Sequence, residues 1–205
     1  MGETEYFLGM RVQQDLDSGT ICLTQCPYWE HVLSHFGLKN VIPRNVPLPV
    51  GIILNNNMSP KTNSKKQDMK DKPYCSILGS IMWGQLATCL DLSFSISLLA
   101  RFQADPGIEH WNVLLHVIGD IKNTLNYSLT YLCNSDILPT AFIDADYGGC
   151  RDTQHSTSGY VFMMAGGPVA WSSKHQATDA DCGSIYCQSG VRCHVSMCTA
   201  NGMDA

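Results

Sequence analysis

Charged residues are scarce in this 205-residue sequence, where they make up 15% of the chain and leave a formal net charge of -5. Nucleic-acid enzymes normally carry an excess of Lys and Arg on the surface that faces the phosphates. Composition alone therefore gives no indication of polynucleotide binding. The hydrophobic content of 44% argues against general disorder and fits a globular protein with a substantial core.

Long apolar runs are also missing. The sequence has no apolar stretch of about 18 residues, as a membrane-spanning helix would need. Its first residues have neither the basic region nor the apolar region of a secretory signal. We therefore expect an intracellular protein, in the cytoplasm or nucleus, that is not secreted and has no membrane partner.

Ten cysteines are present, but no Cys-x-x-Cys pair occurs among them. In a chain without a signal peptide, metal sites are expected before disulfides. Cys182, Cys187, Cys193, His194 and Cys198 could supply a tetrahedral zinc site, although their spacing matches no common zinc finger. Zinc binding by this tail is thus one hypothesis for these residues.

Three short apolar runs, at 141–143, 159–164 and 168–171, are separated by Gly-rich or polar turns. This pattern predicts three successive antiparallel strands. Asp144 then lies at the end of the first strand, and Asp146 shares its face only if the strand continues that far. Without partners, such an Asp is more often a turn or capping residue than a ligand.

The remainder of the chain predicts a hairpin, a connector and several helices. The strands of the hairpin are expected at 6–12 and 20–25, and Pro27 begins a helix that ends at Gly37. Residues 38–70 are rich in Pro and Asn and indicate an extended connector, which includes the start of a Lys-rich patch from Lys61 to Lys72. Apolar spacing of about 3.6 residues predicts helices at 72–87, 91–104 and 108–124.

The motifs Asp144 to Tyr147, Ser156 to Tyr160 and Trp171 to Gln176 resemble, in order, the opening of the ribonuclease H domain in copia-type retrotransposon Pol polyproteins. Upstream segments resemble the region that joins reverse transcriptase to ribonuclease H in the same family: Phe7 to Met10, Leu23 to Gln25, Pro47 to Pro49, Tyr74 to Gly79, Thr88 to Asp91, and His110 with Trp111. The resemblance covers residues 5 to about 178. No aromatic-x-Asp-Asp polymerase motif occurs in the chain.

The resemblance implies an α+β chain with four parts. Residues 1–70 would hold the hairpin, a helix and an extended linker from the end of the reverse transcriptase, and residues 71–126 a helical connection region. Residues 127–178 would form a partial ribonuclease H-like domain that begins with three antiparallel strands. The last part, residues 179–205, is expected to be a frameshifted or disordered tail.

The resemblance also implies a chemistry, the cleavage of RNA in RNA–DNA hybrids by two Mg²⁺ ions held by several carboxylates. Asp144 matches the family's first carboxylate, as a vestigial catalytic residue, and Asp146 is a second possible Mg²⁺ ligand. The implied partners are the hybrid and the remainder of Pol. A family Glu should follow on the next helix, yet no Glu occurs after Glu109, so we expect no productively bound metal and predict no cofactor-binding residue.

A change of reading frame explains the missing Glu. Permissible codons for Asp181 to Ala205, shifted by one nucleotide, can encode the family's strand end and helix, with one Glu across the codon of Gly190. The sequence therefore predicts a degenerate, inactive fragment of a copia-type polyprotein. The alternative is a non-catalytic module, retained for binding either nucleic acid or another protein.

Overall fold

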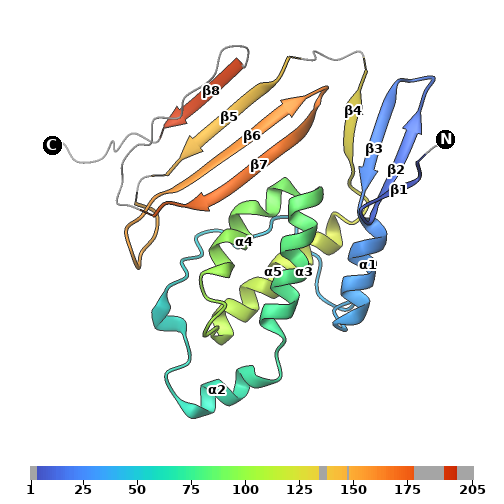
Figure 1. Cartoon of the computed structure of the whole chain (residues 1–205). Coiled ribbons are helices and arrows are strands. Elements are labelled where there is room, and N and C mark those ends of the chain that lie inside the picture. Colours follow the sequence, from blue (N-terminus) through green and yellow to red (C-terminus); the bar gives the residue numbers. More distant parts are fainter. Residues whose placement is uncertain (1–3, 134–137, 147, 178–191, 198–205) are drawn as a thin grey trace. The chain divides into compact units, whose positions relative to one another are not determined.

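A computed structural model describes residues 4–133, 138–146, 148–177 and 192–197 (Figure 1). The chain forms two compact units. The first unit comprises Met1–Gln14 with Ile21–Leu129, and the second comprises Asp15–Thr20 with Thr130–Ala205. Helices with a small sheet make up the first unit and a larger, mainly antiparallel sheet makes up the second, so the predicted α+β class is confirmed.

The predicted hairpin is present, but its first strand is broken. A tight turn at Leu8 and Gly9, both with positive φ, separates β1 (Tyr6–Phe7) from β2 (Met10–Asp15). The two strands pair antiparallel, with Phe7 opposite Met10. β3 (Thr20–Thr24) follows as the neighbour of β2. The prediction of one continuous strand at 6–12 is wrong because a glycine readily adopts the positive φ that this turn requires.

The helix predicted from Pro27 to Gly37 is confirmed as α1 (Cys26–His35), with the proline in its first turn. Gly37 follows the helix with φ +67°, and its N–H donates to the Ser34 carbonyl. A left-handed residue directly after a helix satisfies carbonyls that would otherwise lack a donor. The buried side chains of α1 are Trp29, Val32 and Leu33.

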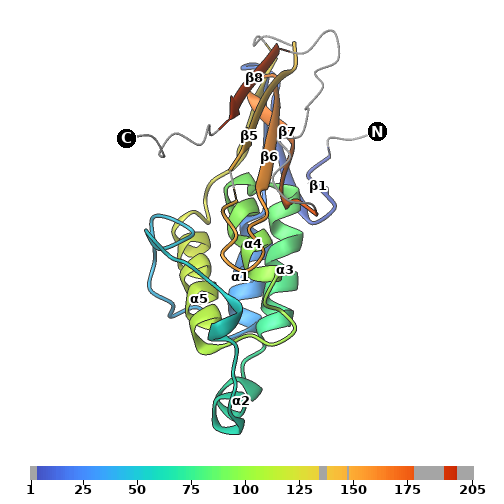
Figure 2. The same cartoon turned by 90° about the vertical axis from the view of Figure 1, so that its left-hand side faces the viewer.

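The helices that follow enclose the core of the first unit. They are η1 (Asn56–Met58), α2 (Asn63–Lys70), α3 (Tyr74–Ala87), η2 (Leu90–Leu92), α4 (Ser93–Ala100) and α5 (Ile108–Asn123). Helix α3 contacts α1, α4 and α5 (Figure 2). Ile81, Leu99, Leu114 and Val117 are fully buried between them. The three predicted helices are thus present, although the second consists of η2 and the shorter α4.

Helix α2 lies in a segment that the sequence predicted to be extended. The hydroxyl of Thr62 caps it by accepting a hydrogen bond from the Lys65 N–H. Between Pro60 and Pro73 the sequence has neither proline nor glycine and is rich in Lys, Gln and Met, which favour helix. The prediction of extended chain is therefore wrong for residues 63–70, because the proline-rich composition ends at Pro60.

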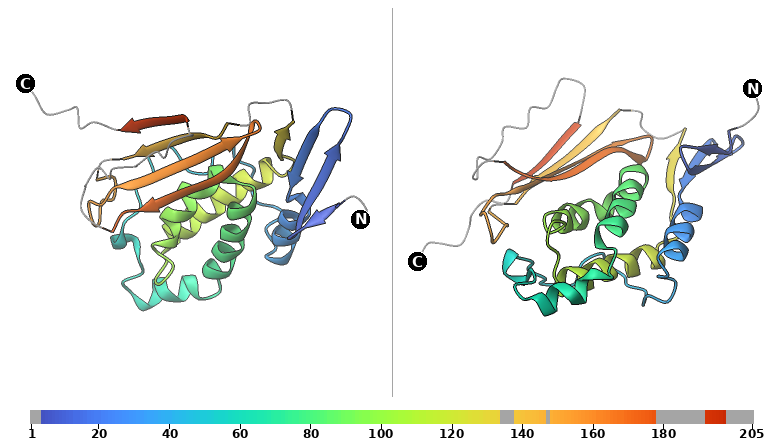
Figure 3. Two further views of the ribbon diagram at one scale, coloured as in Figure 1. Left: turned by 45° about the horizontal axis from the view of Figure 1, so that its top comes forward. Right: turned by 60° about the horizontal axis from the view of Figure 1, so that its bottom comes forward.

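The second unit contains most of β4 (Leu129–Leu132), together with β5 (Thr140–Ala145), β6 (Thr157–Met164), β7 (Gly167–His175) and β8 (Arg192–Met197). The larger sheet has the order β7-β6-β5-β8. Strands β5, β6 and β7 pair antiparallel, which confirms the three predicted strands (Figure 3). Strand β8, which was not predicted, pairs parallel with β5. Apart from the backbone of β8, the tail predicted to be frameshifted lies outside the described residues.

Candidate functional site

Asp144 lies in β5, one residue before the strand ends. Its side chain is exposed, whereas Ala141 and Ile143 point to the opposite, buried face. One carboxylate oxygen accepts a hydrogen bond from the Ala145 N–H at 2.9 Å. The residue opposite on β6 is Gly159, which has no side chain to cover this carboxylate. Asp144 is therefore accessible to an ion or substrate from solvent.

Asp146 has a structural role in the same region. Its N–H donates to the carbonyl of Thr157 at 3.0 Å, and its carboxylate accepts a hydrogen bond from the Thr157 N–H. The carboxylate also lies against Gly149, where an added Cβ would collide with it. Strand β5 ends at Ala145, so the alternation that would place Asp146 with Asp144 does not extend to it. One oxygen of Asp146 is thus already used to close the connection between β5 and β6.

Hydrogen bonds also stabilise the loop between β5 and β6. The buried hydroxyl of Ser156 accepts a hydrogen bond from the Gly148 N–H at 3.1 Å. The buried thiol of Cys150 accepts from the N–H and hydroxyl of Thr153, at 3.4 and 3.0 Å. Ser156, which begins the second motif, therefore contributes to the conformation of this loop.

The described carboxylates do not assemble into a metal centre. Within residues 4–133, 138–146, 148–177 and 192–197, no three His, Cys, Asp or Glu side chains lie close enough to hold an ion. Three of the candidate zinc ligands lie outside these residues: Cys182, Cys187 and Cys198. Cys193 and His194 belong to β8, of which the backbone alone is described. The zinc hypothesis therefore stays a prediction.

A pocket of about 310 Å³ lies in the first unit and was not anticipated from the sequence. Its lining comes from the start of α1, the segment between α3 and α4, and the end of α5 with the residues after it. These segments are far apart in the chain and share no recognisable motif. Thr88 to Asp91 formed part of the family resemblance, but nothing in that pattern indicated a cavity.

No family model matches the chain, and no solved structure matches it. Several known proteins, however, are similar to the chain in sequence. The chain is 32% identical over 176 residues to the retrovirus-related Pol polyprotein from transposon TNT 1-94 of Nicotiana tabacum. It is 31% identical over 175 residues to a putative transposon Ty5-1 protein of Saccharomyces cerevisiae. These matches cover 86% and 85% of the chain.

The chain belongs to the copia-type retrotransposon Pol polyproteins. It spans 13% of the tobacco Pol polyprotein and 54% of the yeast transposon protein. A third relative, an uncharacterized mitochondrial protein of Arabidopsis thaliana, is 30% identical over 178 residues, and 70% of its length is covered. The copia-type resemblance predicted from the motifs is therefore confirmed. Separately, the described part of this Pol segment has no helix long and apolar enough to cross a membrane.

Proposed function

We propose that this chain is a degenerate remnant of the ribonuclease H part of a copia-type Pol polyprotein and that it does not itself cleave RNA. In this proposal Asp144 is a vestigial catalytic residue. The parent reaction is two-metal hydrolysis of RNA paired with DNA, which requires several carboxylates around a pair of Mg²⁺ ions.

The proposal rests on the contacts that the Asp146 carboxylate makes with Thr157 and Gly149. A carboxylate oxygen that accepts a backbone hydrogen bond can still bind a metal ion, but Asp146 is also held against Gly149. Asp144 then remains as the exposed one of the two candidate carboxylates. One carboxylate offers too few oxygens to replace the hydration shell of two hard cations. The absence of Glu from the sequence beyond residue 109 supports the same conclusion.

A cleavage assay tests this proposal. The purified chain and its Asp144→Asn variant are incubated with a fluorescent RNA–DNA hybrid in Mg²⁺, and the RNA is resolved on a denaturing gel. We expect no cleavage by either protein above a no-enzyme control. Mg²⁺-dependent cleavage by the chain that is lost in the variant would overturn the proposal.

A second candidate, nucleic-acid binding without catalysis, is favoured by the lysines on and before α2. Lys61, Lys65, Lys66 and Lys70 are all exposed, in a segment of which Met69 is the buried residue. Lysines that neutralise phosphates release counterions, so affinity should fall steeply with salt. Fluorescence anisotropy of the same labelled hybrid, measured at several salt concentrations, tests this candidate, and binding that weakens steeply with salt supports it. Salt-insensitive binding of a protein partner supports an interaction module instead.

A further inference from the structure

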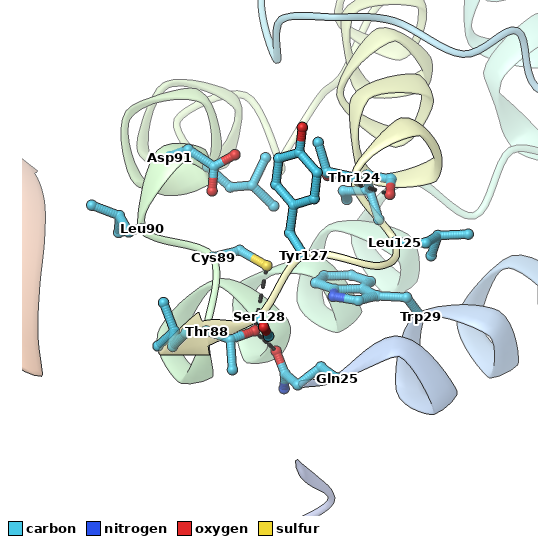
Figure 4. Close-up of a pocket in the computed structure, with 13 residues that line it drawn as sticks. Gln25, Trp29, Thr88, Cys89, Leu90, Asp91, Thr124, Leu125, Tyr127 and Ser128 are labelled. Atoms are coloured by element: carbon cyan, nitrogen blue, oxygen red, sulfur yellow. Dashed lines mark hydrogen bonds between the residues drawn. The ribbon is translucent and has the colours of Figure 1, made fainter. Parts of the chain in front are cut away.

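The pocket in the first unit is built by three segments of the chain (Figure 4). Gln25 and Trp29 come from the start of α1, and Thr88 to Leu92 connect α3 to α4. The third side is formed by six residues between Ile121 and Leu129, among them Thr124, Tyr127 and Ser128. None of the 13 described residues that line the pocket is basic.

The pocket is acidic, because Asp91 lines it and no basic residue does. Asp91 is accessible from the cavity, but the surrounding protein limits its hydration, and this burial raises the pKa of its carboxyl. Asp120, which directly precedes the lining residue Ile121, is 3% exposed. Its Oδ2 atom is buried and accepts no hydrogen bond. Burial, and secondarily the charge of Asp91, raises the pKa of Asp120 to about 6.

Gln25 adds a second buried polar group with unused capacity. Its side chain is 2% exposed, and its Oε1 accepts a hydrogen bond from the Thr88 hydroxyl at 2.6 Å. The Nε2 atom is buried and has no hydrogen-bond partner. A buried amide that is left unpaired destabilises the folded state. The pocket places the carboxylate of Asp91 beside the aromatic rings of Trp29 and Tyr127.

We propose that this pocket binds a guanidinium cation, with Asp91 as its carboxylate partner and the rings of Trp29 and Tyr127 as apolar walls. A guanidinium group is planar, donates two parallel hydrogen bonds to a carboxylate, and stacks on aromatic faces. Its positive charge also lowers the free-energy cost of ionising the nearby buried carboxyl of Asp120.

Other cations fit less well. A divalent metal requires several oxygen ligands at short distance, and no such cluster occurs among the described residues. An alkylammonium ion is compact and strongly hydrated, and it gains less from aromatic walls than a guanidinium does. A cavity of about 310 Å³ is also far larger than a single ion but suits a small organic group. The site is independent of the proposed ribonuclease H remnant, since all its residues lie in the first unit.

NMR titration of the full chain tests the proposal. The probe is ethylguanidinium chloride at low millimolar concentration, and the readout is the indole N–H resonance of Trp29, assigned with a Trp29→Phe variant. Ethylurea serves as a neutral probe of nearly the same shape. We expect saturable shifts with ethylguanidinium and at least about tenfold weaker binding of ethylurea, since the charge-assisted hydrogen bonds are lost.

Variants separate the pocket from nonspecific attraction. Asp91→Asn should weaken ethylguanidinium binding at least about tenfold, whereas Asp105→Asn, which removes the same charge from an exposed loop residue, should leave it unchanged. Tyr127→Leu should also weaken ethylguanidinium binding. Because the side chain of Tyr127 is 75% exposed, this loss of affinity would not result from a disturbed core. Equal binding of both probes, no saturable shift, or full binding by both pocket variants would overturn the proposal.

A peptide identifies the source of the cation. Acetyl-Gly-Arg-Gly-amide that binds more tightly than ethylguanidinium indicates an arginine side chain of another protein segment. Equal or weaker binding of the peptide indicates a small free guanidinium compound. Both results support the site itself.

Discussion

Asp120 has a buried carboxyl group whose ionisation the fold disfavours. Its carboxyl has an ordinary pKa of 3.8 when exposed and a pKa of about 6 in the folded chain, because burial and the charge of Asp91 oppose ionisation. The folded state therefore holds the proton more tightly than the unfolded state. The resulting stabilisation is complete below about pH 4 and is lost as the pH rises through about 6.

We predict that Asp120→Asn removes this pH dependence. Each unit of pKa shift corresponds to about 1.4 kcal/mol, so the free energy of unfolding of the variant should rise relative to the parent by up to about 3 kcal/mol between pH 4 and pH 7. Urea denaturation at several pH values measures this difference. Asp105→Asn is the matched control and should follow the parent, while a constant difference between Asp120→Asn and the parent would contradict the assignment.

At the scale of the element, α3 contains two glycines with opposite surroundings. Gly84 lies against the indole ring of Trp29, and an added Cβ would overlap the ring. Gly79 is exposed, and nothing lies within 4 Å of the position that an added Cβ would take there. Trp29 is 4% exposed and cannot move without disturbing the core. The close approach of α1 and α3 thus depends on Gly84, whereas Gly79 has no such role.

We predict opposite effects when each glycine is replaced by alanine. Gly84→Ala should destabilise the first unit by about 1–3 kcal/mol, because overpacking forces the helices or the indole apart. Gly79→Ala should stabilise it by about 0.5–1 kcal/mol, because alanine has the higher helix propensity. Thermal unfolding followed by far-UV circular dichroism distinguishes the two. Equal effects of both substitutions would mean that α1 and α3 do not pack through Gly84.

At the scale of the whole molecule, the core of the helical unit is self-contained. Its buried cluster extends from Trp29 to Ile121 and, among the residues that the structure describes, takes none from the larger sheet. Burial of this apolar surface supplies the main driving force for folding. The unit defined by contacts ends at Leu129, close to the end of the cluster.

We therefore predict that a fragment of residues 1–129 folds without the larger sheet. It should show helical circular dichroism and a cooperative thermal transition. Leu99 is fully buried, and Leu99→Ala in the fragment should lower its free energy of unfolding by about 2–5 kcal/mol. A fragment without a cooperative transition would show that the cluster requires the remainder of the chain.

Local patterns predicted most of the elements and part of the candidate site. The alternation and turns around 141–171 predicted β5, β6 and β7, and thereby the place of Asp144 near the end of β5. Apolar periodicity predicted α3 and α5. These features follow from the sequence because strand and helix periods are properties of neighbouring residues. Helix α2 and the turn after β1 were not predicted. In both places a few residues decide the local structure, and the average composition of the segment does not reveal them.

The motifs by themselves predicted that this chain belongs to a retrotransposon polyprotein and that Asp144 lies near the end of a strand. The tertiary structure alone decided that Asp146 bonds to Thr157. It also brought Gln25, Asp91 and Tyr127 to one pocket. The physical reason is that a pocket depends on how separate helices pack, and the spacing of residues along the chain carries no record of that packing.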